Sequence, residues 1–320
     1  MTAATDVVTI GNAIVDIIGR CDDAYLARHG CAKGSMRLVD EAALAALYAD
    51  LGPAIEISGG SAANTAVGVA SFGSRAGFIG KIATDEFGKI FSHDIKAAGV
   101  AFQNQAVAPR AGGAGTSRCL VLVTPDGERT MSTLLGISTE FTEADVQPSV
   151  IQGAKVTYLE GYLFDRPEAK AAFRRAAALA KAAGRKVALT LSDAFCVDRH
   201  RAEFLSFIAS DVDILFANES EITALYQVTS FDEAARAART IPLAALTRSA
   251  KGSVVLAQGA EPIAVPAEPV ARVVDTTGAG DLYAAGFLHG LTSGRDHATC
   301  ARDRKSTRLN SSHSSVSRMP

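Results

Sequence analysis

The segment from Val273 to Asp281 carries the residues whose types and spacing most clearly indicate chemistry. It reads Val-Val-Asp-Thr-Thr-Gly-Ala-Gly-Asp and precedes a predicted helix from Leu282 to Thr292. Backbone N–H groups that point out of such a helix start can hold an anion, and here they come from Gly278, Ala279 and Gly280. Asp281 places one carboxylate beside that anion. A phosphoryl group next to a carboxylate that can take a proton from an alcohol indicates kinase chemistry.

Other glycine-rich loops are excluded by their spacing. A dinucleotide-binding turn requires G-x-G-x-x-G, but Tyr283 stands where the third glycine is needed. A phosphate-binding P-loop requires a hydroxyl residue after its lysine. In this chain, isoleucine follows the lysine in both Gly80-Lys81 and Gly88-Lys89. An ordinary strand-to-helix turn is still compatible with the motif, and the agreement of several further features weighs against it.

Two segments in the first part of the chain suit recognition of sugar hydroxyls. Asp16 follows the first predicted strands, where a carboxylate can accept hydrogen bonds from a vicinal diol. Gly59 and Gly60 open a run of small residues, so a ligand can approach the backbone closely there. Asn64, in the same run, offers both a donor and an acceptor. A capping Asp and tight helix–sheet packing would explain the same residues without a ligand.

Three further positions lie at the carboxyl ends of predicted strands, where open α/β sheets bind ligands. Asn218 and Glu221 lie on the same side of a first helical turn and suit hydrated Mg²⁺ with phosphate, although a helix cap would use the same pair. The segment from Thr247 to Gly252 combines hydroxyls, charge and a glycine, which suits triphosphate contacts. Glu160 supplies another carboxylate after a strand.

Apolar strands alternate with helices of about ten to fifteen residues, which predicts an α/β fold with a mostly parallel central sheet covered on both faces. A predicted hairpin around Pro125-Asp126-Gly127 and an irregular segment from Arg20 to Val39 do not fit this alternation, and we place them in a small β extension over one edge. The predicted helices are Glu41–Leu51, Thr65–Ser71, Glu86–Ala98, Glu168–Ala183, Arg201–Ala209, Glu219–Tyr226, Asp232–Thr240 and Leu282–Thr292.

Composition narrows the class of protein. The 320 residues are 48% hydrophobic, and the formal net charge of −2 gives no basic footprint for nucleic acid. The five cysteines are scattered and never in C-x-x-C spacing, which favours reduced thiols in a cytoplasmic protein. No segment approaches the roughly twenty apolar residues that a membrane span requires. The Ser- and Arg-rich residues 303–320 lack apolar periodicity and resemble translated sequencing adapter, so we expect a disordered, non-native tail.

The glycine–aspartate motif, the Gly59–Asn64 segment and the pair Asn218-x-x-Glu221 resemble the signatures of the ribokinase-like family, the phosphofructokinase-B type of sugar and nucleoside kinases. The resemblance covers about residues 6–302. It implies a three-layer sandwich with a small β-lid, formed here by about 18–38 and 106–134, and a kinase domain over residues 1–302 that is truncated at its C-terminus. It also implies ATP and Mg²⁺ as cofactors and allows a homodimer through the lid.

The resemblance implies a role for each matching position. Asp281 matches the catalytic base, and Gly278, Ala279 and Gly280 match the anion hole for the γ-phosphoryl group. The residues that match substrate-binding positions are Asp16, Gly60, Asn64 and Glu160. The residues that match positions for the nucleotide are Asn218, Thr247, Gly252, Asp275 and Thr277, with Glu221 acting on Mg²⁺ through water. We expect Asp281 to stay ionised, because the helix dipole stabilises a carboxylate at this end.

Within the family, Lys33–Met36 and Asp126–Thr130 resemble the adenosine-kinase-like branch, so we expect phosphorylation of the primary hydroxyl of a nucleoside, with adenosine first. Glu160 departs from typical eukaryotic adenosine kinases at a position that is acidic in several sugar kinases. A free-sugar kinase acting on ribose or fructose therefore remains open. A catalytically silent sugar- or nucleoside-binding protein is disfavoured because Asp281 and the anion-hole residues are all present, and a nicotinamide-dependent oxidoreductase is disfavoured by the glycine spacing. We expect neither nucleic acid nor a membrane as partner.

Overall fold

The computed structural model describes residues 4–104, 106–108, 113–267 and 278–302. The predicted site residues Asp275 and Thr277, and the tail 303–320, lie outside the described residues. Among the described helices, none is both long and apolar enough to span a bilayer.

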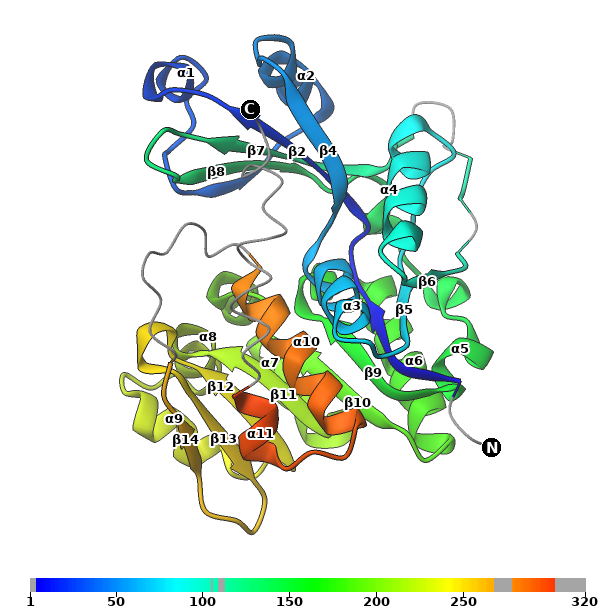
Figure 1. Cartoon of the computed structure of the whole chain (residues 1–320), viewed down its shortest axis with the longest axis vertical. Helices are drawn as coiled ribbons and strands as arrows, with labels where there is room; N and C mark the ends of the chain where they lie inside the picture. Colours follow the sequence, from blue (N-terminus) through cyan, green and yellow to red (C-terminus); the bar gives the residue numbers. More distant parts are fainter. Residues whose placement is uncertain (1–3, 105, 109–112, 268–277, 303–320) are drawn as a thin grey trace.

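The described residues form a large, mostly parallel sheet (Figure 1). Only its last two pairings, between β12 and β13 and between β13 and β14, are antiparallel. In spatial order, its strands are β14 (Ile263–Val265), β13 (Ser253–Ala257), β12 (Leu243–Thr247), β11 (Ile214–Asn218), β10 (Lys186–Thr190), β9 (Ala154–Glu160), β1 (Thr5–Ile10), β5 (Ala76–Ile79) and β6 (Ala101–Phe102).

Successive residues of a strand point to opposite faces of the sheet, and helices cover both of these faces. Val7 and Val8 of β1 are both fully buried, and they belong to different hydrophobic clusters. One face packs against α3 (Ser61–Ser71), α4 (Glu86–Ala97), α10 (Ala279–Thr292) and α11 (His297–Ala301). The other packs against α5 (Pro148–Gln152), α6 (Pro167–Ala182), α7 (Ala194–Asp211), α8 (Glu219–Tyr226) and α9 (Phe231–Ala238). The predicted α/β fold with a central sheet is confirmed.

A smaller second sheet lies beside the first, above the beginning of α10 in the view of Figure 1. Its strands, in spatial order, are β3 (Met36–Leu38), β8 (Arg129–Leu134), β7 (Ser117–Val123), β2 (Ile14–Arg20) and β4 (Ala54–Gly59). Residues Val15 and Ile17 of β2 pack with α1 (Asp23–Arg28) and α2 (Glu41–Ala49) on one face. The opposite face carries Ile18, Cys119 and Val121 in a separate apolar cluster.

The extent of the second sheet differs from the predicted lid segments, 18–38 and 106–134. Strand β2 begins at Ile14, and β4, for which the sequence predicted no element, pairs along most of β2. Strand β4 was missed because its strand character comes from pairing with β2 and not from a clear local pattern. That this sheet acts as a lid stays a prediction.

Short 3₁₀ segments complete the described structure: η1 (Gly136–Glu140), η2 (Glu143–Asp145), η3 (Gly161–Asp165) and η4 (Ser249–Lys251). Three helices begin three or more residues earlier than their sequence pattern predicted. Helix α3 starts at Ser61 instead of Thr65, α7 at Ala194 instead of Arg201, and α10 at Ala279 instead of Leu282. Helix α7 has a kink at His200, just before its predicted start, and the early starts of α3 and α10 consist of small residues and Asp or Asn without apolar periodicity. The consequence is that Ser61, Asn64 and Asp281 all lie in first helical turns.

Candidate active site

The carboxyl ends of the parallel strands meet along one edge of the large sheet. Leu159 of β9 pairs with Ile10 of β1, so Glu160 directly follows the end of β1 in register. Farther along the same edge, Asn218 of β11 pairs with Thr247 of β12. The register therefore brings Glu160, Asn218 and Thr247 to the edge where ligands bind in open α/β sheets.

The carboxylate of Asp281 is held by two side chains from α3. Its Oδ1 accepts a hydrogen bond from Ser61 Oγ at 2.6 Å, and its Oδ2 accepts one from Asn64 Nδ2 at 3.2 Å. The two helices approach closely because Gly68 faces α10: a methyl group built there would lie 2.6 Å from the Cβ of Ala285. The packing of α3 on α10 thus brings together residues that are far apart in the sequence.

Burial raises the pKa of Asp281, and the hydrogen bonds from Ser61 and Asn64 oppose this shift. That Asp281 stays ionised at neutral pH stays a prediction, and desolvation, which penalises the charged form, acts against it. A carboxylate with a raised pKa is a better proton acceptor than an ordinary Asp. This change suits general-base work near neutral pH.

The start of α10 leaves backbone donors free for an anion. The first bond inside the helix runs from Leu282 N to Gly278 O, so the N–H groups of Ala279, Gly280 and Asp281 precede the intrahelical ladder. Gly278 adopts the left-handed conformation, with φ of +71°. Ala279 and Gly280 are exposed, and a methyl group on Gly280 would meet no atom within 4 Å. No described residue occupies the space beside Gly280, so a phosphoryl group would not clash with the described part of the chain there.

Asp16 lies in β2 of the second sheet, and Gly60 joins β4 of that sheet to α3. A methyl group built on Gly59 would lie 2.3 Å from a carboxylate oxygen of Asp16, so only glycine fits beneath it. Gly60 has φ of +94°, and a methyl group there would lie 2.4 Å from Asn12 O. Burial raises the pKa of Asp16 to about 7, with the charge of Arg129 opposing and that of Asp281 reinforcing the shift. The two carboxylates therefore lie close enough to interact.

Glu160 does not lie where a substrate contact requires it. The residue is 1% exposed. Its Oε1 accepts hydrogen bonds from Asn12 N at 3.3 Å and Asn12 Nδ2 at 2.8 Å, while Oε2 accepts one from Ala62 N at 2.8 Å. Burial raises its pKa to about 7, although these donors oppose the shift. The expected substrate-binding role does not fit this geometry, because the carboxylate is turned into the protein.

Asn218 and Glu221 form the first turn of α8 through a reciprocal capping box. The Asn218 side chain accepts from Glu221 N at 2.9 Å, and Glu221 accepts from Asn218 N at 2.9 Å and from Asn218 Nδ2 at 2.6 Å. Both carboxylate oxygens of Glu221 are therefore engaged, and burial raises its pKa to about 7. No group of three or more metal-ligating side chains occurs among the described residues. This arrangement fits an influence on Mg²⁺ through water and not direct ligation.

Thr247 ends β12 next to Asn218, and Gly252 closes the turn that follows. Gly252 has φ of +86°, and a methyl group there would lie 2.1 Å from Val265 O, so the turn itself requires glycine. Within the turn, the Arg248 guanidinium stacks on Phe231 at 3.8 Å. The roles of Thr247 and Gly252 in binding a nucleotide stay predictions.

Three residues that contribute to this site were not predicted from the sequence. Ser61 donates to Asp281, Asn12 donates to Glu160, and Thr9 Oγ1 donates to Ala62 O at 2.8 Å. Ser61 follows the Gly59-Gly60 pair directly, so its place in the motif was a usable signal. Thr9 and Asn12 gave none, because their partners come from other strands and helices.

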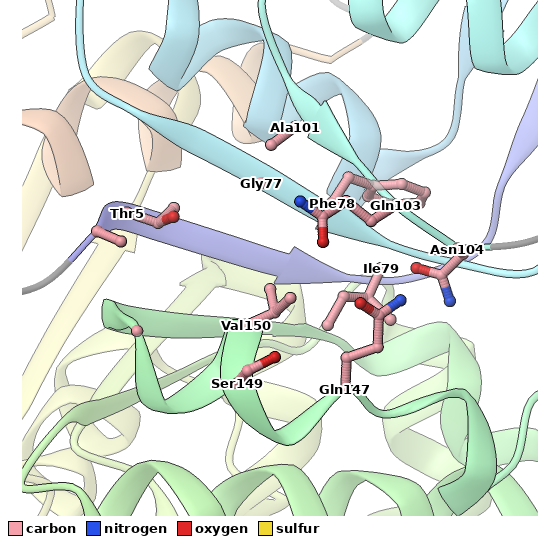
Figure 2. Close-up of a pocket in the computed structure, with 12 residues that line it drawn as sticks. Thr5, Gly77, Phe78, Ile79, Ala101, Gln103, Asn104, Gln147, Ser149 and Val150 are labelled. Carbon is pink, nitrogen blue, oxygen red and sulfur yellow. The ribbon is translucent and has the colours of Figure 1, made fainter.

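A separate cavity of about 230 Å³ lies away from these carboxylates, between β5, the edge strand β6 and helix α5 (Figure 2). Its lining is neutral and includes Ile79, Val150 and the carboxamides of Gln103, Asn104 and Gln147. None of the described residues that line it could transfer a proton. The chemistry is therefore assigned to the edge that holds Asp281 and not to this cavity.

Comparisons with known proteins show which proteins this chain is similar to. A family model described as pfkB family carbohydrate kinase matches residues 56–303. The crystal structure of adenosine kinase from Sinorhizobium meliloti is 53% identical, with a TM-score of 0.86 over 93% of this chain and 91% of that one. A probable sugar kinase protein from Rhizobium etli CFN 42 is 48% identical, with a TM-score of 0.86 over 94% and 91%. Adenosine kinase from Saccharomyces cerevisiae is 28% identical over 319 residues, 91% of this chain and 90% of the relative.

Proposed function

This chain belongs to the pfkB family of carbohydrate kinases, and we propose that it transfers the γ-phosphoryl group of ATP to the primary hydroxyl of adenosine. The observation that carries the proposal is the Asp281 carboxylate, held by Ser61 and Asn64 beside the open amides of a helix start. The family membership makes the protein a phosphotransferase that uses ATP, and the adenosine kinase relatives support the choice of acceptor.

Each group in the site has a defined task in this reaction. Asp281 accepts the proton of the attacking hydroxyl as the bond to phosphorus forms. The N–H groups of Ala279 and Gly280 hold the charge of the transferred group, which is the dominant catalytic contribution when the transition state is loose. Asp16 accepts hydrogen bonds from the vicinal ribose hydroxyls. Ser61 and Asn64 keep the Asp281 carboxylate in place.

Mg²⁺ is the proposed metal cofactor, and when bound with ATP it neutralises phosphate charge. The described residues offer oxygen groups near the expected phosphates but no cage of protein ligands, which fits an ion that keeps several waters and binds mainly through phosphate oxygens. Glu221 and Asn218 orient this hydrated ion through water. Thr247 and Gly252 line the nucleotide side.

The inner face of the second sheet, which is the face opposite to α1 and α2, favours a nucleoside over a free sugar as the acceptor. Asp16 shares this face with an apolar cluster, because Ile14, Asp16 and Ile18 alternate along β2. The cluster comprises Ile18, Cys119 and Val121 with Ile14, Ile57, Val123 and Met131 packed against it. A purine base can bury its faces against such a surface, whereas a free hexose or pentose brings only further hydroxyls. The apolar cluster therefore supports adenosine as the acceptor.

A coupled ADP-release assay with adenosine, inosine, ribose and fructose tests the proposal. We expect kcat/KM for adenosine to exceed that for ribose by about 100-fold or more, since burial of the base contributes about 3 kcal/mol or more of binding. Equal or greater turnover of ribose or fructose would instead assign a free-sugar kinase, as the probable sugar kinase relative suggests. Binding of adenosine with no release of ADP would assign a silent binding protein.

The apolar cluster can be tested separately. Ile57→Ser places a hydroxyl on the inner face of β4, opposite Asp16, and we expect it to raise KM for adenosine about tenfold. The matched control is Glu56→Ser, which changes the next residue on the opposite face of the same strand. An equal effect of both substitutions would argue against a base-binding surface.

We also propose a homodimer through the edge of the second sheet and a reducing, cytoplasmic location. The edge strand β3 exposes Met36 and Leu38, which are 46% and 58% exposed. Leu38→Lys should convert a dimer to a monomer in sedimentation velocity, and a wild-type monomer would refute this part. The location is supported by the five cysteines, all of which are free thiols.

A further inference from the structure

Glu160 is a buried carboxylate for which the proposed reaction has no direct use. It lies at the end of β9 and is 1% exposed, and both of its oxygens accept hydrogen bonds from other groups of the protein. Keeping a carboxylate in such a place costs stability, as its raised pKa shows. The donors around it indicate what this carboxylate does.

One of its oxygens helps to hold the first turn of α3. Ala62 N donates to Glu160 Oε2 at 2.8 Å, and Ala62 O accepts from Thr9 Oγ1 at 2.8 Å. Both backbone polar groups of Ala62 are therefore bonded to side chains of the central sheet. Ser61 precedes this residue and Asn64 follows soon after it, so the sheet determines where both donors to Asp281 lie.

The other oxygen holds the junction between the two sheets. Glu160 Oε1 accepts from the backbone and side chain of Asn12, which links β1 to β2. Asn12 O lies against Gly60, and β2 carries Asp16. A single carboxylate thus joins the segment that bears Asp16 to the helix that orients the proposed catalytic base.

We infer that Glu160 is a positioning residue, which joins Asn12 to Ala62 so that Ser61 and Asn64 of α3 hold the Asp281 carboxylate in its reactive place. The inference rests on the proposed function for its kinetic consequences. It replaces the substrate-binding role that the sequence pattern suggested for Glu160, since a residue this buried offers no surface to a sugar.

Replacing Glu160 can change the pKa of Asp281 in two ways, and the two ways shift it in opposite directions. Loss of the Ser61 hydrogen bond raises the pKa of Asp281, because that bond favours its ionised form. Removing the negative charge of Glu160 by itself acts in the opposite direction. Among the described residues, the ionisable groups whose charge interacts with Asp281 include Asp16, Tyr158, Glu160 and Glu221, and Arg129 acts on Asp16.

The central variant is Glu160→Gln. The single acceptor oxygen of the new side chain cannot serve both Asn12 and Ala62, so its amide N–H groups must face one of those donors. We expect kcat to fall by about tenfold or more, KM for adenosine to change by less than about threefold, and the acid limb of the kcat–pH profile to move upward by about one pH unit. Ser61→Ala should move the limb in the same direction, and the double variant should add little to either.

Exchanging the two partners supplies a rescue. In the double variant Asn12→Asp/Glu160→Gln, the carboxylate introduced at position 12 accepts from the amide introduced at position 160, which leaves the amide oxygen for Ala62 N. Only the longer bond from the backbone N–H of position 12, at 3.3 Å in the wild type, loses its acceptor. We expect the double variant to recover most of the lost kcat and to return the acid limb toward its wild-type position. A structural defect without a specific contact would instead worsen with the second substitution.

Hydrogen–deuterium exchange tests the positioning without any turnover. Glu160→Gln should raise uptake in a peptide covering 59–66, and the exchanged pair should restore protection, while a control peptide from α6 stays unchanged. A downward shift of the acid limb, a rise in KM at unchanged kcat, or unchanged uptake in 59–66 would overturn the inference. If the wild-type enzyme phosphorylates none of the four acceptors, the proposed function fails, and the exchange result still decides the positioning role.

Discussion

Replacing Asp281 by asparagine separates catalysis from folding in this site. In Asp281→Asn, the new amide can donate to Ser61, whose hydroxyl both donates and accepts, while the amide oxygen still accepts from Asn64. Each hydrogen-bonding group therefore keeps a partner, and only the proton-accepting carboxylate is lost. Loss of general-base assistance lowers kcat by about 10²- to 10⁴-fold, which corresponds to about 3–5 kcal/mol in the barrier.

The same substitution should not destabilise the fold. Because the pKa of Asp281 is raised in the folded protein, the ionised carboxylate opposes folding at pH 8, and a neutral isostere removes that cost. We expect the unfolding midpoint at pH 8 to be unchanged or higher, with KM for adenosine within a few-fold of wild type. A matched control is Asp232→Asn, an exposed carboxylate in the first turn of α9, which should leave kcat unchanged. A kcat for Asp281→Asn within tenfold of wild type, or a loss of activity that tracks a loss of folded protein, would refute the reasoning.

Three further outcomes follow from the geometry. The pKa values of Asp16, Glu160 and Glu221 are raised to about 7, so the folded protein takes up protons at a higher pH than the unfolded chain. The free energy of unfolding in urea should therefore rise between pH 8 and pH 5.5, by up to about 2 kcal/mol for each of these groups. A flat or opposite trend would contradict these shifts. Gly60→Ala should cost about 1–3 kcal/mol of stability and weaken adenosine binding in calorimetry, because φ is +94° and Asn12 O lies in the way; wild-type affinity would count against it. Gly68→Ala should separate α3 from α10, which should lower stability by about 1–3 kcal/mol and also lower kcat. A loss of stability without a loss of kcat would show that Asp281 does not depend on this contact.

Much of the chemistry was visible in local sequence because it depends on backbone conformations that few residues allow. The Gly278–Asp281 motif predicted an anion site beside a carboxylate, and the structure has left-handed Gly278 and an open helix start there. The pair Asn218 and Glu221 could be recognised in the sequence as well. Its two interpretations, a helix cap and a pair that acts on a metal, are both compatible with the observed capping box. Patterns of this kind can be recognised in sequence because every partner lies within a few residues.

The substrate-binding role predicted for Glu160 does not fit the structure, because the partners of this residue are far from it in the sequence. A carboxylate after a strand at the ligand edge looks the same in sequence whether it faces the cleft or the protein. Its direction was decided by Asn12, 148 positions away, and by Ala62, 98 positions away. The same is true of the burial that raises the pKa of Asp281, since the local sequence did not indicate how far water is excluded from this side chain.

The alternation of strands and helices, the glycine turns and the kinds of groups available could thus be predicted from the amino-acid sequence alone, since they follow from short-range sterics and periodicity. Which of those groups share a site, how much water reaches them and which are occupied with one another depended on how the whole chain packs. Hydrogen bonds and desolvation act between atoms that are close in space, and folding brings such atoms together from segments that carry no mark of their partners.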